Sequence, residues 1–249
     1  MKIGYICPSG KKVKFDKCPC RKPCLPVPVM RALKQSASEE VKGGYWRVSE
    51  LIGQPTQVIL RKKYDYYAVP STEVIMLWGT MIHMLLEKYA DNEIAEQRKE
   101  VRFKKWCITG KPDVYIPSQK KLIDYKFTNS FTLKELQKEG HPYYLQLNLY
   151  RYLFYPEAKK LELVLFMRDA SGVAGILPIE TVNVPIMKDK EVVSFLIDTL
   201  ENLNKLSLMP VSELPPCPER WNDRRCLYYC DVKDFCPYFI KQMRGGDND

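Results

Sequence analysis

The sequence lacks several features that would place it in whole classes of protein. It has no apolar run of the roughly 18 residues needed to span a membrane, so we expect no membrane partner. Residues 1–7 lack the apolar core of a signal peptide, and we expect a cytoplasmic protein of prokaryotic or phage origin that is not secreted. No Gly-x-x-x-x-Gly-Lys-Ser/Thr loop is present, which excludes an ATP-driven motor of its own.

The composition is that of an ordinary folded protein. Hydrophobic residues make up 45% and charged residues 28% of the 249 residues, which is enough for one sizeable core and a small appended module. The formal charge of +9 favours polyanions as partners. Charge alone does not distinguish nucleic acid from an anionic membrane surface.

Nine cysteines are many for a chain without an export signal. Disulfides are rare in reducing compartments, so clustered thiols are expected to bind metal. One cluster lies near each end of the chain, and Cys107 stands alone as an expected core thiol. No Cys-x-x-Cys pair adjoins a βαβ pattern, which disfavours a thiol redox protein.

Composition shifts divide the chain into five parts. We expect a small basic four-cysteine module, a linker, a main core, a second four-cysteine segment and a flexible tail, at residues 1–28, 29–48, 49–210, 211–240 and 241–249.

Periodicity within the main core predicts an α/β (α+β) fold in which helices flank a mixed central sheet. The expected helices cover residues 71–95, 133–139, 142–153 and 189–205. The expected strands cover residues 101–108, 113–116, 121–127, 160–166 and 175–184.

Two acids and a lysine are the strongest candidates for chemistry. Asp124 and Lys126 point to the same face of a strand, and Asp113 begins the preceding strand after a glycine turn. If the two strands pair, both carboxylates converge beside an ammonium group and can hold Mg²⁺ or Mn²⁺ with an attacking water. The acid-x-lysine spacing taken alone is equally typical of an exposed strand face.

The wider pattern resembles the PD-(D/E)XK superfamily, specifically RecB-type nuclease domains that include CRISPR-associated iron–sulfur exonucleases. The resemblance covers roughly residues 49–239 and rests on five motifs: Gly79-x-x-x-His83, Gly110-x-x-Asp113, Asp124-Tyr125-Lys126, Gln146-x-x-x-Tyr150 and the trailing cysteines. It implies a restriction-endonuclease-like core in which His83, Asp113 and Asp124 ligate the metal. Lys126 would assist catalysis, and Gln146 and Tyr150 would contact DNA or support the site. Without this context, His83 would be a hydrogen-bonded core residue.

The C-terminal cysteines are Cys217, Cys226, Cys230 and Cys236. Four thiolates so close in sequence can enclose a tetrahedral zinc or an iron–sulfur cluster. The resemblance favours a 4Fe–4S cluster, with Zn²⁺ as the alternative. In such relatives the first ligand precedes the histidine helix, whereas residues 51–57 here have no cysteine. Either Cys217, which we favour, or an N-terminal thiol is then the fourth ligand, or the site holds zinc.

The N-terminal cysteines are Cys7, Cys18, Cys20 and Cys24, surrounded by lysine and arginine. Their arrangement predicts a small zinc-organised module that grips phosphates. A solvated basic tail is the alternative.

These observations predict a Mg²⁺- or Mn²⁺-dependent deoxyribonuclease, and the resemblance implies an exonuclease that acts on single-stranded DNA or DNA ends. The resemblance implies a role in DNA repair, recombination, phage replication or CRISPR adaptation, with a helicase or a recombination or adaptation protein as partner. The alternative is a non-catalytic nucleic-acid-binding module that keeps the nuclease fold.

Overall fold

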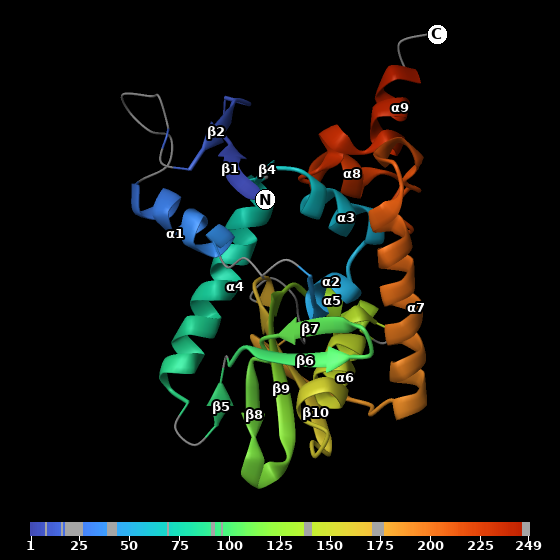
Figure 1. Cartoon of the computed structure of the whole chain (residues 1–249). Helices are drawn as coiled ribbons and strands as arrows, with labels where there is room; N and C mark the ends of the chain where they lie inside the picture. The colour runs from blue at the N-terminus through green and yellow to red at the C-terminus, as the bar shows by residue number, and fades with distance from the viewer. Residues whose placement is uncertain are drawn as a thin grey trace. The chain divides into compact units, whose positions relative to one another are not determined.

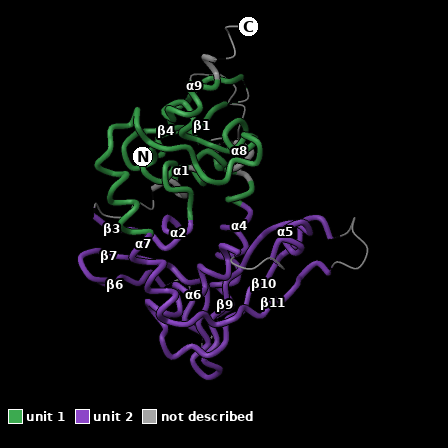
Figure 2. Tube along the Cα trace, turned by 90° about the vertical axis from the view of Figure 1, so that its right-hand side faces the viewer, with its two compact units in different colours: residues 1–41, 53–77, 199–249 green, residues 42–52, 78–198 purple. Residues whose placement is uncertain are grey.

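The computed structural model describes residues 1–7, 9–15, 17, 27–38, 44–68, 70–90, 93–95, 97–136, 141–170 and 177–245. The chain forms two compact units, each assembled from segments distant in sequence (Figure 2). Unit 1 comprises residues 1–41, 53–77 and 199–249, and unit 2 comprises residues 42–52 and 78–198. Within the described residues the strands form three mixed sheets flanked by helices, so the fold is of the expected α/β class.

Unit 1 contains a three-stranded sheet and a group of helices (Figure 1). Its strands are β1 (Lys2–Ile6), β2 (Lys12–Lys14) and β4 (Tyr66–Ala68), in the order β2-β1-β4. Its helices are α1 (Val27–Ser38), α3 (Pro55–Lys63), α8 (Arg224–Tyr228), α9 (Pro237–Gly245) and the short turns η3 (Val211–Glu213) and η4 (Lys233–Phe235). Two long helices, α4 (Pro70–Lys88) and α7 (Asp189–Leu208), contribute one end each to this unit.

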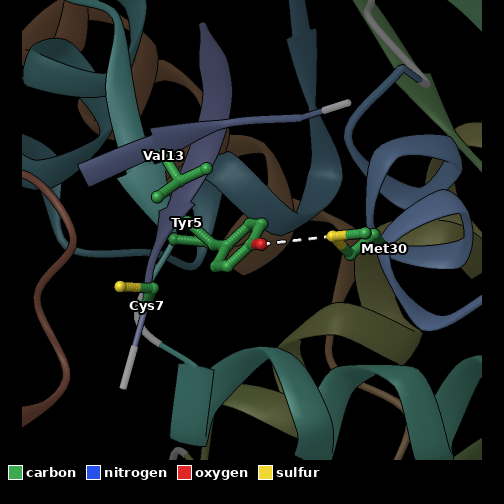
Figure 3. Close-up of a cluster of buried hydrophobic side chains, with 5 residues drawn as sticks. Tyr5, Cys7, Val13 and Met30 are labelled. Carbon is green, nitrogen blue, oxygen red and sulfur yellow. Dashed lines mark hydrogen bonds between the residues drawn. The ribbon is translucent and has the colours of Figure 1, made fainter. Parts of the chain in front are cut away.

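A small apolar cluster organises the N-terminal sheet (Figure 3). Tyr5 and Val13 from neighbouring strands pack with Met30 of α1 and Ala68 of β4, and the Tyr5 hydroxyl donates to the Met30 sulfur at 3.2 Å. The N-terminal segment therefore shares its core with residues beyond position 28. Helix α1 also occupies the first part of the stretch that we expected to be a linker.

Unit 2 contains the other two sheets. Its first strands and helices are β3 (Tyr45–Arg47), α2 (Val48–Leu51), β5 (Ile94–Ala95), β6 (Lys99–Phe103), β7 (Trp106–Gly110) and β8 (Val114–Ile116). After the turn η1 (Pro117–Gln119) follow β9 (Lys121–Thr128), α5 (Ser130–Glu135), α6 (Pro142–Phe154), β10 (Lys160–Met167) and β11 (Ile179–Val184).

The larger sheet of unit 2 has the order β11-β10-β9-β8-β5 (Figure 1). Its centre is the parallel pair β9 and β10, in which Asp124 lies beside Leu163. Along β10 buried and less buried side chains alternate, as expected of a strand whose two faces differ in burial. The smaller sheet has the order β3-β7-β6.

Most expected elements of the core are present, with shifted ends. The expected strand at residues 101–108 was wrong, because it contains the turn of a hairpin between β6 and β7. Lys104 in that turn has a φ of 52°, a left-handed conformation that interrupts the strand. The helix expected at 71–95 ends at Lys88, and the one expected at 133–139 begins earlier, at Ser130. Within the described part of the chain, no helix combines the length and apolar character needed to cross a bilayer.

Candidate active site

A hairpin brings the two candidate carboxylates together. Strands β8 and β9 pair antiparallel with Val114 opposite Ile123, so the same register continued by one residue sets Asp113 opposite Asp124. The Asp113 carboxylate accepts a 2.7 Å hydrogen bond from the backbone N–H of Tyr125. The pairing that the sequence argument required is therefore confirmed.

Glycine is required just before this hairpin. A Cβ added at Gly110 would lie 2.7 Å from the Tyr150 ring and 2.6 Å from the Phe154 ring, both on α6. Such distances are far below van der Waals contact, so a side chain at position 110 would force the Tyr150 and Phe154 rings to move. This close approach gives a physical reason for the glycine of the Gly-x-x-Asp motif. At Gly79, by contrast, an added Cβ would meet no described atom within 4 Å.

Lys126 lies on the same face of β9 as Asp124. Its Nζ is 2.5 Å from Oδ2 of Asp124 and donates to Oε1 of Gln146 at 3.1 Å. The carboxylates of Asp124 and Asp113 raise the pKa of Lys126 above its ordinary value against the opposing effect of burial. The ammonium group is thus charged and held between a strand and a helix.

Asp124 is almost fully buried, with 1% of its surface exposed. Its pKa is raised to about 6, because burial and, to a smaller extent, the Asp113 charge outweigh the lowering effects of Lys126 and His83. The two carboxylates are therefore close enough to interact electrostatically. Keeping such a carboxylate ionised in the folded protein costs free energy, and such groups are typical of functional sites.

His83 comes from the part of α4 that belongs to unit 2. Its Nδ1 lies 3.3 Å from Oδ1 of Asp113, and its ring meets that of Tyr125 edge-on at 6.1 Å. The histidine therefore belongs to the same cluster as the strand acids, as the motif order implied.

Helix α6 supplies Gln146 and Tyr150, one turn apart. Gln146 Nε2 donates to the Tyr150 hydroxyl at 3.2 Å while its Oε1 accepts from Lys126. Tyr150 is buried, and burial raises its pKa to about 12, so its phenol remains protonated at neutral pH. His141 caps the helix: its Nδ1 accepts from the Tyr143 backbone N–H at 3.2 Å.

Tyr143 is a site residue that lies outside the motifs used to predict the active site. The Lys126 ammonium lies 4.9 Å from the centre of its ring, in cation–π contact. The available signal was its spacing, because Tyr143 precedes Gln146 by three residues and so shares its helix face.

The donor set fits a hard divalent cation. Oδ1 of Asp124 is buried and has no hydrogen-bond partner in the described part of the chain. A buried carboxylate oxygen without a donor is one that Mg²⁺ or Mn²⁺ can satisfy. As they stand, no three His, Cys, Asp or Glu side chains among the described residues lie close enough to enclose one ion. An ion held by the acids would compete with their contacts to Lys126 and His83.

The C-terminal cysteines lie near one another in unit 1, and none of them is in a disulfide. Cys217 interacts electrostatically with Cys226 and Cys236, and Cys230 interacts with Cys217. Burial raises the pKa of three of these thiols, to about 12 for Cys230.

Backbone hydrogen bonds to two cysteines and one ion pair with α3 fix the cysteine segment. Hydrogen bonds from the Gln57 and Val232 backbone to Cys217 and Cys230 lower the pKa of those thiols, opposing the effect of burial. Arg61 of α3 pairs with Asp231 at 2.9 Å.

The N-terminal cluster is described only at Cys7, whose sulfur is 2.8 Å from the Ser9 hydroxyl. Cys18, Cys20 and Cys24 lie outside the described residues.

Comparison with known proteins supports the fold. The chain resembles the crystal structure of SSO0001, with a TM-score of 0.55 and 20% identity, over 84% of this chain and 93% of that one. It also resembles, with a TM-score of 0.41 and 18% identity, a phage-related exonuclease from Haemophilus somnus 129PT, over 65% of this chain and 92% of that one. No model of a protein family and no curated protein sequence matches the chain. The first of these similarities shows a shared fold, and neither establishes an activity.

Proposed function

We propose that this chain is a metal-dependent nuclease of the PD-(D/E)XK type that hydrolyses phosphodiester bonds in DNA. The observation that carries the proposal is the buried Asp124 carboxylate, which contacts Lys126 and lies beside Asp113. A buried acid with a raised pKa, a second acid and a charged lysine at one place are hard to explain by stability alone.

In the proposed site Asp113, Asp124 and His83 would hold Mg²⁺ or Mn²⁺. Such an ion, when bound, lowers the pKa of a coordinated water and stabilises charge on the phosphoryl group. Lys126 would supply a positive charge beside the attacked phosphate, from a position set by Gln146 and Tyr143. Tyr150 would orient Gln146 through its hydroxyl.

We further propose that the substrate is single-stranded DNA or a DNA end, as the family resemblance implies. The net charge of +9 supports a polyanionic substrate. A role in repair, recombination, phage replication or CRISPR adaptation, beside a helicase or a recombination or adaptation protein, remains part of this proposal.

For the cysteines we propose a bound 4Fe–4S cluster at Cys217, Cys226, Cys230 and Cys236, with Zn²⁺ as the alternative. The electrostatic interactions among the four thiols in one unit support this choice, and because no three of them enclose an ion as they stand, binding would require the thiols to move closer together. For the N-terminal cysteines, Zn²⁺ binding by Cys7, Cys18, Cys20 and Cys24 is proposed from their sequence alone.

The decisive experiment compares Lys126→Ala with Lys121→Ala, two lysines on the same strand. Lys121 pairs with Glu162 at 3.4 Å and lies five residues before Lys126 on β9, so it controls for the loss of a charge from the same strand. With Mn²⁺ or Mg²⁺ and labelled single-stranded and duplex DNA, Lys126→Ala should cleave about 100-fold or more slowly, because it removes an electrostatic catalyst. Lys121→Ala should cleave at nearly the wild-type rate.

Cleavage by folded Lys126→Ala at the wild-type rate would mean that this site is not catalytic. If the wild-type protein binds DNA but cleaves it with neither ion, the chain is instead a non-catalytic nucleic-acid-binding module. Thermal unfolding of both variants shows whether each is folded.

A further inference from the structure

A second surface with chemistry of its own lies in unit 1, in the cysteine segment. Three aromatic side chains there are well exposed: Trp221 at 58%, Tyr228 at 61% and Tyr229 at 44%. We call these three residues the aromatic patch. None of them belongs to the candidate active site, whose residues all lie in unit 2. Exposed aromatic residues gathered in a short segment are typical of a binding surface.

The backbone that carries Trp221 is fixed in an unusual conformation. Trp221, Asn222 and Asp223 all have left-handed φ values, of 53°, 52° and 64°. Side-chain-bearing residues rarely adopt this conformation, so three in succession require support from their surroundings. The Asp223 carboxylate provides it by accepting from Arg220 Nε and from the Tyr238 hydroxyl, at 3.1 Å each. The turn therefore presents the indole in a set position.

Two neighbours orient the indole and leave it accessible. The Arg225 guanidinium lies over the ring at 5.0 Å, in cation–π contact. The Tyr229 ring meets it edge-on at 6.0 Å. More than half of Trp221 remains exposed despite both contacts. A held aromatic ring with an accessible face can stack on a planar ligand at little entropic cost.

The charges around the patch favour an anionic ligand. Each of the four acids from 219 to 241 is paired with a base: Glu219 with Arg225, Asp223 with Arg220, Asp231 with Arg61 and Asp234 with Lys12. Arg224, Lys233 and Lys241 are additional to those pairs, so the segment and its partners carry excess positive charge.

We propose that the aromatic patch, with Arg224 and Arg225, is a binding site for single-stranded DNA. Aromatic rings stack on unpaired bases, which a duplex hides, and arginine side chains neutralise phosphates. The site goes beyond the proposed catalytic function, because it holds a strand without cleaving it. Its chemistry needs no residue of the catalytic cluster.

The test measures binding by the full chain in EDTA, where metal-dependent cleavage does not occur. Fluorescence anisotropy of a short labelled oligodeoxythymidylate should give about 5- to 100-fold weaker binding for Trp221→Ala and for Tyr228→Ala, as expected for loss of one stacked base. Trp221→Phe, which keeps an aromatic ring, should recover most of the affinity. The matched control is Tyr89→Ala in unit 2, which removes a tyrosine that is 70% exposed, and it should bind as wild type does.

Salt dependence tests the charged part of the proposal. Arg224→Gln should make the slope of log affinity against log salt shallower by about one phosphate contact. Unchanged affinity in folded Trp221→Ala and Tyr228→Ala would overturn the proposal, and the patch would then be a surface for a protein partner. Equal losses for a duplex of the same length would also overturn it. Because no cleavage is measured, the result is independent of whether the catalytic proposal holds.

Discussion

At the scale of single residues, Asp124 shows how burial sets the chemistry of a carboxylate. Its neighbours in the sheet include Leu163, which is fully buried, whereas Lys126 and His83 favour its charged form. The protein therefore keeps a carboxylate whose ionisation costs folding free energy. The cost is explained if the ionised form is needed to bind a cation.

This cost predicts a pH dependence of stability in the metal-free protein. The pKa of Asp124 is raised from 3.8 to about 6, so between these values the folded chain binds more protons than the unfolded chain. The contribution of Asp124 to the free energy of unfolding should therefore decrease as pH rises from about 4 to about 6, by on the order of 2 kcal/mol, and then level off. In Asp124→Asn this contribution should be absent.

Urea unfolding in EDTA at several pH values, for wild type and Asp124→Asn, measures the difference between the two curves. Titrating groups distant from Asp124 change both proteins alike and cancel in that difference, so the remainder reports Asp124 together with its contacts to Asp113, Lys126 and His83. A difference that does not vary between pH 4 and 7 would mean that Asp124 has an ordinary pKa in the folded protein.

At the scale of elements, the site is built by one hairpin and two helices. Strands β8 and β9 set the two acids side by side, α6 supports Lys126, and α4 brings His83 to Asp113. The cysteine segment also depends on contacts between elements: Arg61 of α3 forms an ion pair with Asp231, in the loop after Cys230.

The cysteine segment gives a prediction of its own. Anaerobically purified wild-type protein should be brown, with broad visible absorbance and bound iron, if the thiols hold the proposed 4Fe–4S cluster. Cys230→Ser removes one thiolate of the set and should lose most of the colour and iron. Cys107→Ser, on strand β7 of unit 2, is the matched control and should keep both.

If the wild-type protein is colourless and contains zinc, the four cysteines bind Zn²⁺ and not an iron–sulfur cluster. Equal metal loss in Cys107→Ser and Cys230→Ser would contradict both assignments, since only the second residue lies among the clustered thiols.

At the scale of the whole molecule, the chain separates its chemistry between two units. The acidic–lysine cluster belongs to unit 2 and the C-terminal cysteines with the aromatic patch belong to unit 1. Each unit is made of segments distant in sequence, so neither corresponds to a single continuous stretch of the chain.

Ion binding should therefore be visible in the stability of the intact chain. A cation that binds the folded protein alone stabilises it by about 3 kcal/mol at 100 times its dissociation constant. For a chain of this size Mn²⁺ should then raise the Tm by about 5–10 °C, and EDTA should reverse the change. The comparison is with Asp113→Asn, which removes one charged ligand and should show a much smaller shift. Equal shifts in the two proteins would place the ion elsewhere.

The sequence by itself determined the class of the fold and which acids and lysine meet in unit 2. Alternation in residues 121–127 and the turn before Asp113 are local signals, so the strands and the orientation of Asp124 and Lys126 followed from the chain alone. The hairpin at residues 101–108 was missed because its turn has no glycine, and Lys104 adopts a left-handed conformation instead.

Only the tertiary structure decided how these residues act together. The cation–π contact of Lys126 with Tyr143, the approach of α6 to Gly110 and the deep burial of Asp124 join segments distant in sequence. Unit 1 also joins segments distant in sequence, because it is built from the first, middle and last parts of the chain. Such contacts depend on how helices pack against the sheet, and this packing is set by shape and burial across the whole chain rather than by local periodicity.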